Sequence, residues 1–388
     1  MGEHARLMPS KAYQWVNCPA SVTLQERYPE TDRSESAEEG TAAHEVAAKV
    51  LGDFLYYGRK GHSFKAEDFI DTVATNGVVI SEEMVEAVEM YVHDVMQVSR
   101  RYDGMSDVFL EHRVHIPWVH ADNWGTLDNA VTFYGAQSDT LVISDFKYGR
   151  GIVEAEGNEQ LLNYAMGLIA ELIERNKPVP RLIELRVVQP RPYHSAGRVR
   201  PWTLPVSELG PYVEKFRDSA AEAFGPAPRA KPGKHCTYCS ARHTCTALRN
   251  SNYAAIDYVM AASPEELRGA DLGQHITVLR HISELVKAQL SGFELQGLAE
   301  LEAGRKVDGW AWERSTGKKK WCKPLEEVHV LGDLMGVELR KPGAITPLQA
   351  ISAGMPSSLV DSYSETTSGK VNLVPESTKR SKVIFKQS

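Results

Sequence analysis

The sequence predicts an α/β protein, with a mixed sheet flanked by helices in the order helix, three-strand meander, helix, strand. Three short apolar runs follow one another closely, and an amphipathic helical run and a fourth apolar run come after them. A change in character near residues 253–263 predicts two regions. We expect one domain over 1–255 and a mainly helical C-terminal region over 256–388.

Composition is typical of a soluble globular protein, with 42% hydrophobic and 24% charged residues in a chain of 388. No run of 18 apolar residues is present, and the opening "MGEHARLMPSKAYQW" lacks the apolar centre of a signal peptide. We therefore expect a cytoplasmic protein, in a bacterium or a phage-infected host, with no membrane partner. Five cysteines without a secretion signal favour reduced thiols or metal ligands over disulfides.

The net charge of −7 is unevenly distributed. Residues 101–180 hold 6 Lys/Arg against 12 Asp/Glu, a net of −6, whereas residues 181–250 hold 12 against 5, a net of +7. A basic segment beside an acidic one fits a protein that contacts phosphate with one part and metal with another. Ordinary scatter of surface charge explains the same numbers.

Two helices are predicted early in the chain, over 37–57 and 81–101. The first has an acidic start and a closing glycine. In the second, Ser81 can cap the N-terminus, and Glu82 and Glu83 favour the positive end of the helix dipole.

The three strands are predicted over 108–117, 124–135 and 141–149. Short, turn-rich connectors separate them, so an antiparallel meander is expected. The amphipathic run 157–176 predicts a long helix, and "LIELRVVQP" (182–190) predicts a further strand.

The later chain is predicted to be mostly helical. A helix over 207–225 leads into a Pro/Gly-rich basic hinge over 225–234, and residues 263–304 read as helix. "GWAWERSTGKKKW" (309–321) is predicted to form a β-hairpin with a basic turn, which is compatible with nucleic-acid contact or with a solvated turn. The polar chain from 357 on is predicted to be partly disordered.

The stretch "LVISDFKYG" carries an acid and a base at the end of an apolar strand. Asp145 and Lys147 are two residues apart, so their side chains share one face of the strand. A local ion pair explains this arrangement. A catalytic pair, with one group holding a metal and the other steering a water, explains it too.

Other residues can join this pair. Asp128 lies on the preceding strand, so it can converge with Asp145 on one ion, and Glu111 on the first strand can add a third carboxylate. His44 is a potential nitrogen ligand on the early helix. Each is also explained singly as a packed or solvated residue, as is the pair four residues apart on one helix face, Gln160 and Tyr164.

These residue types suit the hydrolysis of a phosphodiester. That reaction needs charge neutralised on the phosphate and a deprotonated water in line. Carboxylates bind Mg²⁺ or Mn²⁺, and an imidazole ligand shifts the preference toward Mn²⁺. A lysine beside the metal can stabilise the transition state or orient the water.

The motifs "GTAAHE", "GTLD", "DFK" and "QLLNY" together resemble the RecB-like nucleases of the PD-(D/E)XK superfamily, over residues 4–250. The resemblance implies the nuclease core of that superfamily. It implies a catalytic set of Lys147, Asp145, Asp128, Gln160 and Tyr164, to which Glu111 of the first strand can add a third carboxylate. It also implies metal ligation by His44, Asp128, Asp145 and the carbonyl of Phe146. The third motif has Asp where Glu is commoner, which shortens the reach to a metal.

Four cysteines form a further pattern, with three in C-x2-C-x5-C spacing and one far upstream: Cys236, Cys239, Cys245 and Cys18. The set resembles the iron–sulfur staple of AddB-type and CRISPR-associated RecB-like nucleases. Four thiolates suit a [4Fe–4S] cluster and equally a structural Zn²⁺. His235 and His243 keep a Cys/His zinc site open, and Cys322 is left as a free thiol.

The sequence therefore predicts a metal-dependent DNA nuclease, an exonuclease of phage recombination or DNA processing. The later part, including "VNLVPESTKRS", resembles RecB-like proteins of phages and prophages. That setting implies DNA and a phage recombination protein, such as a single-strand annealing protein, as partners, and leaves oligomer formation open. A structure-specific endonuclease and a non-cleaving DNA-binding protein on a nuclease fold are the alternatives.

Overall fold

The computed structural model describes most of the chain: residues 5–28, 35–57, 65–101, 105–135, 139–194, 196–261, 266–339, 347, 350 and 355–375. The chain separates into two compact units, Met1–Gln289 and Leu290–Ser388. This division reflects contacts and does not test the domain boundary predicted at residues 255/256, which stays a prediction.

The first unit is built on a five-stranded mixed sheet whose strands lie in chain order: β1 (Met105–His115), β2 (Trp124–Phe133), β3 (Thr140–Phe146), β4 (Leu182–Val188) and β5 (Val199–Pro205). Strands β3 and β4 are parallel, and the other neighbours are antiparallel. The predicted mixed sheet is thus confirmed. The prediction missed β5, an edge strand whose Pro201 and Pro205 cannot donate to a ladder and are tolerated at an edge.

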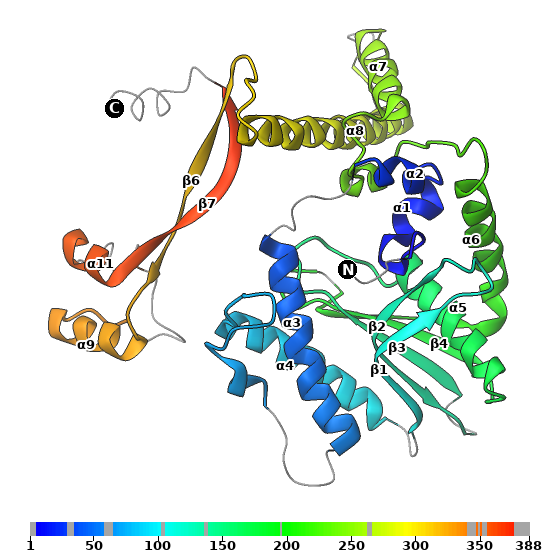
Figure 1. Cartoon of the computed structure of the whole chain (residues 1–388), viewed down its shortest axis with the longest axis horizontal. Coiled ribbons are helices and arrows are strands. Elements are labelled where there is room, and N and C mark those ends of the chain that lie inside the picture. Colours follow the sequence, from blue (N-terminus) through cyan, green and yellow to red (C-terminus); the bar gives the residue numbers. More distant parts are fainter. Residues whose placement is uncertain are drawn as a thin grey trace. The chain divides into compact units, whose positions relative to one another are not determined.

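Helices cover both faces of this sheet (Figure 1). One face packs against α5 (Glu159–Glu174), with α1 (Ala12–Asn17) and α6 (Gly210–Ala223) beside it. The other face packs against α3 (Glu35–Gly52) and α4 (Glu82–Ser99). The predicted cap holds, because the Ser81 hydroxyl accepts a hydrogen bond from the Met84 amide at 3.3 Å.

Shorter elements and two later helices complete the unit: η1 (Pro9–Lys11), α2 (Ser21–Glu26), η2 (Asp53–Tyr57), η3 (Ala66–Phe69), η4 (Val206–Leu209), η5 (Lys234–Tyr238), α7 (Thr246–Ala261) and α8 (Gly269–Glu302), which runs on into the second unit. Helix α7 was not predicted. In the described residues, no helix combines the length and hydropathy that a membrane span requires.

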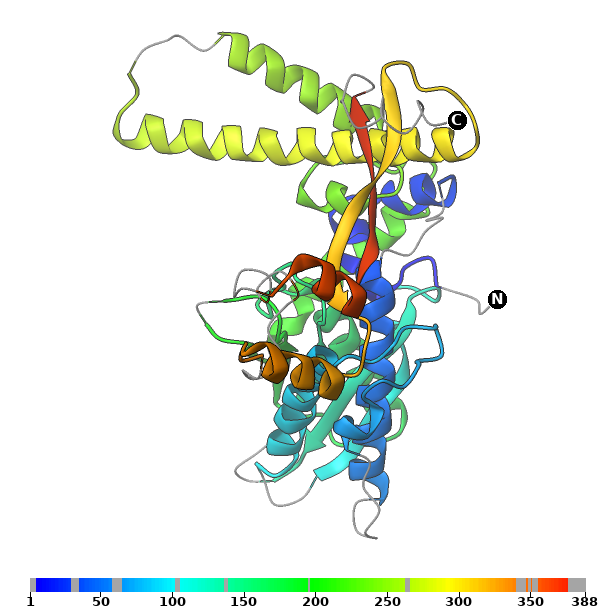
Figure 2. The ribbon, with the colours of Figure 1, turned by 90° about the vertical axis from the view of Figure 1, so that its left-hand side faces the viewer.

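The second unit corrects one prediction. The predicted hairpin over 309–321 is wrong, because this stretch is a single strand, β6 (Trp310–Trp321), paired with β7 (Ser364–Pro375) along its length (Figure 2). The segment around Thr316 forms register irregularities and does not turn the chain. Within the polar chain from 357 on, predicted to be partly disordered, residues 357–375 form α11 (Ser357–Tyr363) and β7, and α9 (Leu325–Met335) packs with α11 in a small core. The tail beyond 375 lies outside the described residues.

A glycine sets the close approach of α5 to β1. A Cβ atom on Gly167 would lie 2.3 Å from Val114 Cγ1 and 2.7 Å from the His115 carbonyl oxygen. We expect Gly167→Ala to lower the free energy of unfolding by about 1–3 kcal/mol through overpacking, as measured by urea denaturation. Gly40→Ala is the matched control. Its Cβ would meet nothing within 4 Å on α3, so a gain of about 0.5–1 kcal/mol is expected. Equal effects of both changes would contradict the packing described.

Candidate active site

The sheet brings two acidic residues to the same position on neighbouring strands. Asn129 of β2 pairs with Ser144 of β3, so Asp128 and Asp145 are the next residue on each strand. The Phe146 amide donates a hydrogen bond to Asp128 Oδ2 at 2.8 Å. The carboxylate of Asp128 is therefore fixed against the backbone that carries Asp145 and Lys147.

Three ligand atoms converge at Asp128. One atom each of His44, Glu111 and Asp128 lie within 4.8 Å of one another. His44 comes from α3, and its Nδ1 is 3.3 Å from Asp128 Oδ1. Glu111 lies opposite Asp128 on β1, since Leu110 pairs with Asn129 and His112 with Leu127.

Glu111 has an unusual backbone for a strand residue. Its φ is +44°, a left-handed conformation that non-glycine residues rarely adopt. Such strain persists only where the surrounding structure holds it, and it concentrates at functional sites. Here it occurs in the strand residue whose carboxylate meets His44 and Asp128.

The charges of these three groups depend on one another. Burial alone would lower the pKa of His44, but the adjacent carboxylate of Asp128 raises it to about 9. Burial would raise the pKa of Asp128, but the imidazolium of His44 holds it below its usual value. Burial and the negative charge of Asp128 raise the pKa of Glu111 to about 7. The cluster therefore holds an ion pair of His44 with Asp128 and a partly protonated Glu111. A divalent cation can take the place of the protons on His44 and Glu111.

Asp145 and Lys147 form a second group with Gln160 of α5. Lys147 Nζ lies 2.9 Å from Asp145 Oδ2 and donates to Gln160 Oε1 at 3.0 Å. Gln160 Nε2 in turn donates to Asp145 Oδ1 at 3.2 Å. Asp145 Oδ2 is buried, and in the described part of the chain its polar contact is the ion pair with Lys147. A carboxylate oxygen with one such contact has a lone pair left for a metal ion or a further donor.

Lys147 is held in its charged form. Burial alone would lower its pKa, but the carboxylates of Asp145 and Asp128 raise it above the usual value. Burial raises the pKa of Asp145, against the opposing effect of Lys147. A positive charge in this half-buried place is therefore stable beside the two aspartates.

Tyr164 supports the site from α5 at one remove. Its hydroxyl donates to the Thr126 carbonyl oxygen at 2.6 Å, two residues before Asp128. The Phe146 side chain is fully buried and stacks on Tyr91, with ring centroids 4.9 Å apart. Metal ligation through the Phe146 carbonyl stays a prediction.

Sequence reasoning missed Gln189, which follows β4 and is completely buried. Its amide donates to the carbonyl oxygens of Gly149 and Gly151 and accepts from the Val153 amide at 3.1 Å. It thus fixes the loop that follows Lys147. A polar residue at the end of the apolar run "LIELRVV" was the available signal, the same one that marked Asp145.

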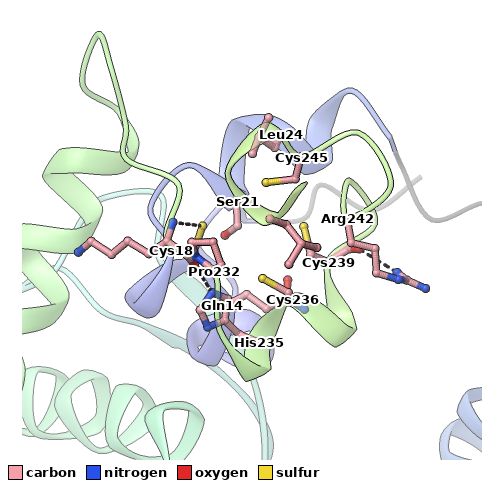
Figure 3. A pocket seen from close by; sticks show the side chains of 12 residues that line it. Gln14, Cys18, Ser21, Leu24, Pro232, His235, Cys236, Cys239, Arg242 and Cys245 are labelled. Atoms are coloured by element: carbon pink, nitrogen blue, oxygen red, sulfur yellow. Dashed lines mark hydrogen bonds between the residues drawn. The ribbon is translucent and has the colours of Figure 1, made fainter. Parts of the chain in front are cut away.

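The four predicted cysteines line one cavity, although one lies more than two hundred residues upstream (Figure 3). Cys18 comes from the end of α1, and Cys236, Cys239 and Cys245 come from η5 and the segment after it. The Lys231 amide donates to Cys18 Sγ at 3.4 Å, and Gln14 Nε2 donates to the Tyr238 carbonyl oxygen at 2.9 Å. The N-terminal segment is therefore in direct contact with the late one.

Two thiols of this cavity are hard to ionise without a cation. Burial raises the pKa of Cys236 to about 11 and that of Cys239 to about 12. Of the two nearby histidines, His235 lines the cavity, but its Nε2 lies 2.8 Å from the Lys231 carbonyl oxygen. His243 packs edge-on against Tyr28 and is not among the lining residues.

Comparison with known proteins adds a family and two structural likenesses. The family described as "Protein of unknown function (DUF2800)" matches residues 4–381. The crystal structure of SSO0001 is similar over 64% of this chain and 88% of its own, with 14% identity and a TM-score of 0.26. A phage-related exonuclease from Haemophilus somnus 129PT is similar over 57% of this chain and 94% of its own, with 11% identity and a TM-score of 0.23. Because these TM-scores are low, the function has to be inferred from the residues of the site itself.

Proposed function

The chain belongs to the family described as "Protein of unknown function (DUF2800)", and we propose that it is a metal-dependent DNA nuclease that hydrolyses phosphodiester bonds. One observation carries this proposal. The group of His44, Glu111 and Asp128 lies next to the pair of Asp145 and Lys147, because β1, β2 and β3 adjoin in one sheet and His44 of α3 contacts Asp128. Cation ligands beside a fixed, half-buried ammonium are what phosphodiester hydrolysis needs.

The residues fit a divalent cation of the Mn²⁺ or Mg²⁺ class. Asp128 and Glu111 offer oxygens, His44 offers a ring nitrogen, and Asp145 offers a buried carboxylate that also pairs with Lys147. A bound cation would supply positive charge to the phosphate and acidify a water. The mixed nitrogen–oxygen set favours Mn²⁺ over Mg²⁺.

Lys147 provides the second positive charge. Asp145 and Gln160 hold its ammonium at 2.9 and 3.0 Å, so the charge is oriented before substrate arrives. An ammonium fixed in this way stabilises the negative charge that develops on the phosphate, or orients the attacking water. Gln160 bridges Asp145 and Lys147, and Tyr164 holds the strand that carries Asp128.

The resemblance to RecB-like nucleases supports an exonuclease of phage recombination or DNA processing. Cleavage of matched linear and closed circular DNA, single- and double-stranded, with Mn²⁺ or Mg²⁺, tests this. Degradation of linear DNA alone is expected of an exonuclease, whereas cutting of the circle or of branched DNA indicates an endonuclease. Binding of DNA without cleavage under any of these conditions would reject the proposed activity.

We also propose a [4Fe–4S] cluster as the occupant of the cysteine cavity. Sulfurs around one tetrahedral Zn²⁺, each about 2.3 Å from it, lie less than 4 Å apart. Among the described residues, no three of these cysteine sulfurs lie within 4.8 Å of one another. A cluster of four irons holds its thiolates farther apart. The purified protein should be brown, and a colourless protein with stoichiometric zinc would reject the cluster.

Metal binding should release protons from the site. Because the pKa of His44 is about 9 and that of Glu111 about 7, His44 is protonated at pH 7 and Glu111 about half so. The cation must displace these protons, so Mn²⁺ affinity should rise as pH increases toward 9. Calorimetry in buffers of different ionisation enthalpy should show release of about 1–1.5 protons at pH 7.

His44→Ala should weaken Mn²⁺ binding at least about tenfold and reduce the proton release accordingly. His112→Ala is the matched control, since His112 lies next to Glu111 in the chain but pairs with Glu171 at 2.9 Å. Unchanged Mn²⁺ affinity in His44→Ala would remove His44 from the ligand set.

A further inference from the structure

The segment that follows β4 emerges beside the candidate active site. Strands β3 and β4 are parallel, so their C-terminal ends lie at the same edge of the sheet, and the Lys147 amide donates to the Val188 carbonyl oxygen at 2.9 Å. Tyr193 is five residues beyond Val188, which places it within about 17 Å of that carbonyl. A DNA strand bound at the site would need to extend only a few nucleotides to reach Tyr193.

This segment is held firmly on both sides of Tyr193. Arg191 is only 10% exposed in its side chain, and its guanidinium bonds Glu39 of α3 at 2.9 Å and Glu83 of α4 at 3.0 Å. The same guanidinium lies 4.4 Å from the ring centroid of Tyr148, the residue after Lys147. On the other side, His194 Nε2 lies 3.0 Å from Glu154.

Tyr193 itself points to solvent. It is 90% exposed, more than any other large hydrophobic residue in the part of the chain that the structure describes. Pro190 and Pro192 precede it and restrict the backbone, so the segment adopts few other conformations. A buried arginine and two prolines thus hold an aromatic ring outward, which is the arrangement of a pre-formed contact surface.

A second apolar side chain is presented from the neighbouring loop. Ile152 is 56% exposed, and Gln189 bonds the backbone of both its neighbours, Gly151 and Val153. Arg150 of the same loop is 67% exposed in its side chain and lies 3.5 Å from Glu83. An aromatic ring, an aliphatic group and an arginine are the groups that contact bases and phosphates of a single strand.

We propose that Tyr193 stacks on an unpaired base of the DNA strand entering the active site, with Ile152 beside it, so that the preferred substrate has a single-stranded end. This proposal rests on DNA being the ligand, as the proposed function states. Stacking on an aromatic side chain is insensitive to base identity, because every base has a π-face. Discrimination should therefore be between unpaired and paired ends, and not between sequences.

The test uses oligonucleotides with 2-aminopurine at either end, single-stranded or in a blunt duplex, bound to the full chain in EDTA so that no cleavage occurs. Wild-type protein should quench the fluorescence of the single-stranded probe. Tyr193→Ala should lose the quenching and bind that probe about 5- to 150-fold more weakly, the loss of one base stack. Tyr193→Phe should retain both, and Tyr253→Ala, which removes a 60% exposed tyrosine from α7, should resemble wild type.

Binding and quenching by Tyr193→Ala equal to wild type, or no quenching by wild type at either end, would overturn the stacking proposal. Cleavage assays keep the two proposals apart. If wild type degrades DNA and Tyr193→Ala binds normally, the nuclease stands and the stacking falls. If quenching depends on Tyr193 but no metal supports cleavage, the stacking stands and the nuclease falls.

Discussion

Lys147→Ala is expected to lower the rate of DNA cleavage about 10²–10³-fold, because it removes the positive charge that Asp145 and Gln160 hold in place. The fold should survive. Lys147 directly follows β3, and its side chain is 26% exposed, so its loss leaves no large cavity. Asp145 can take up a proton when its partner is lost. Initial rates with saturating Mn²⁺ and thermal unfolding of the same preparation measure the two effects.

Lys177→Ala is the matched control for this change. Lys177 is 46% exposed in its side chain and pairs with Asp107 at 3.1 Å, away from the candidate site. It should cleave DNA at the wild-type rate, which would show that loss of a paired lysine is harmless elsewhere. Full cleavage by a folded Lys147→Ala protein would remove this residue from the mechanism.

Cys18→Ala is expected to abolish cluster binding and to destabilise the first unit. A cluster bound by Cys18 and the residues 236–245 closes a loop of more than two hundred residues, which restricts the unfolded chain. By analogy with cross-links of that length, the loss should be about 2–5 kcal/mol of unfolding free energy. Iron analysis and thermal unfolding measure the two effects together.

Cys322→Ala provides the control, since Cys322 is an exposed thiol outside the cavity. It should keep the metal content and the unfolding temperature of wild type. Wild-type iron content in Cys18→Ala would remove Cys18 from the ligand set. Loss of iron with unchanged stability would instead show that the cluster does not stabilise the first unit by linking Cys18 to residues 236–245.

The parts of the fold that could be predicted are those whose signals are local. Alternation of apolar residues predicted β1 to β4, and a serine cap marked the start of α4. Each lies within a few residues of its predicted bounds. Strand β5 has two prolines and little alternation, so it became visible only through its pairing with β4. In β6, "STGK" has the composition of a turn, but pairing with the distant β7 extended it into a strand.

The candidate site shows the same division. Asp145 and Lys147 could be placed together because residues two apart share a face of a strand. The meeting of Glu111 with His44 and Asp128 depends on the register of β1 and on a strained φ, which no local pattern encodes. Gln189 was missed because its role lies in hydrogen bonds to a loop some forty residues earlier in the chain.

The central claim is that His44, Glu111 and Asp128, with Asp145 beside them, bind the catalytic cation. Crystals soaked in Mn²⁺ and measured at its absorption edge test this most directly. We predict one anomalous peak about 2.0–2.4 Å from a ring nitrogen of His44 and in contact with a carboxylate oxygen of Asp128. A peak held by carboxylates with His44 outside that range would return His44 to a packing role. No peak at Asp128, in a preparation that cleaves DNA with Mn²⁺, would contradict the claim as a whole.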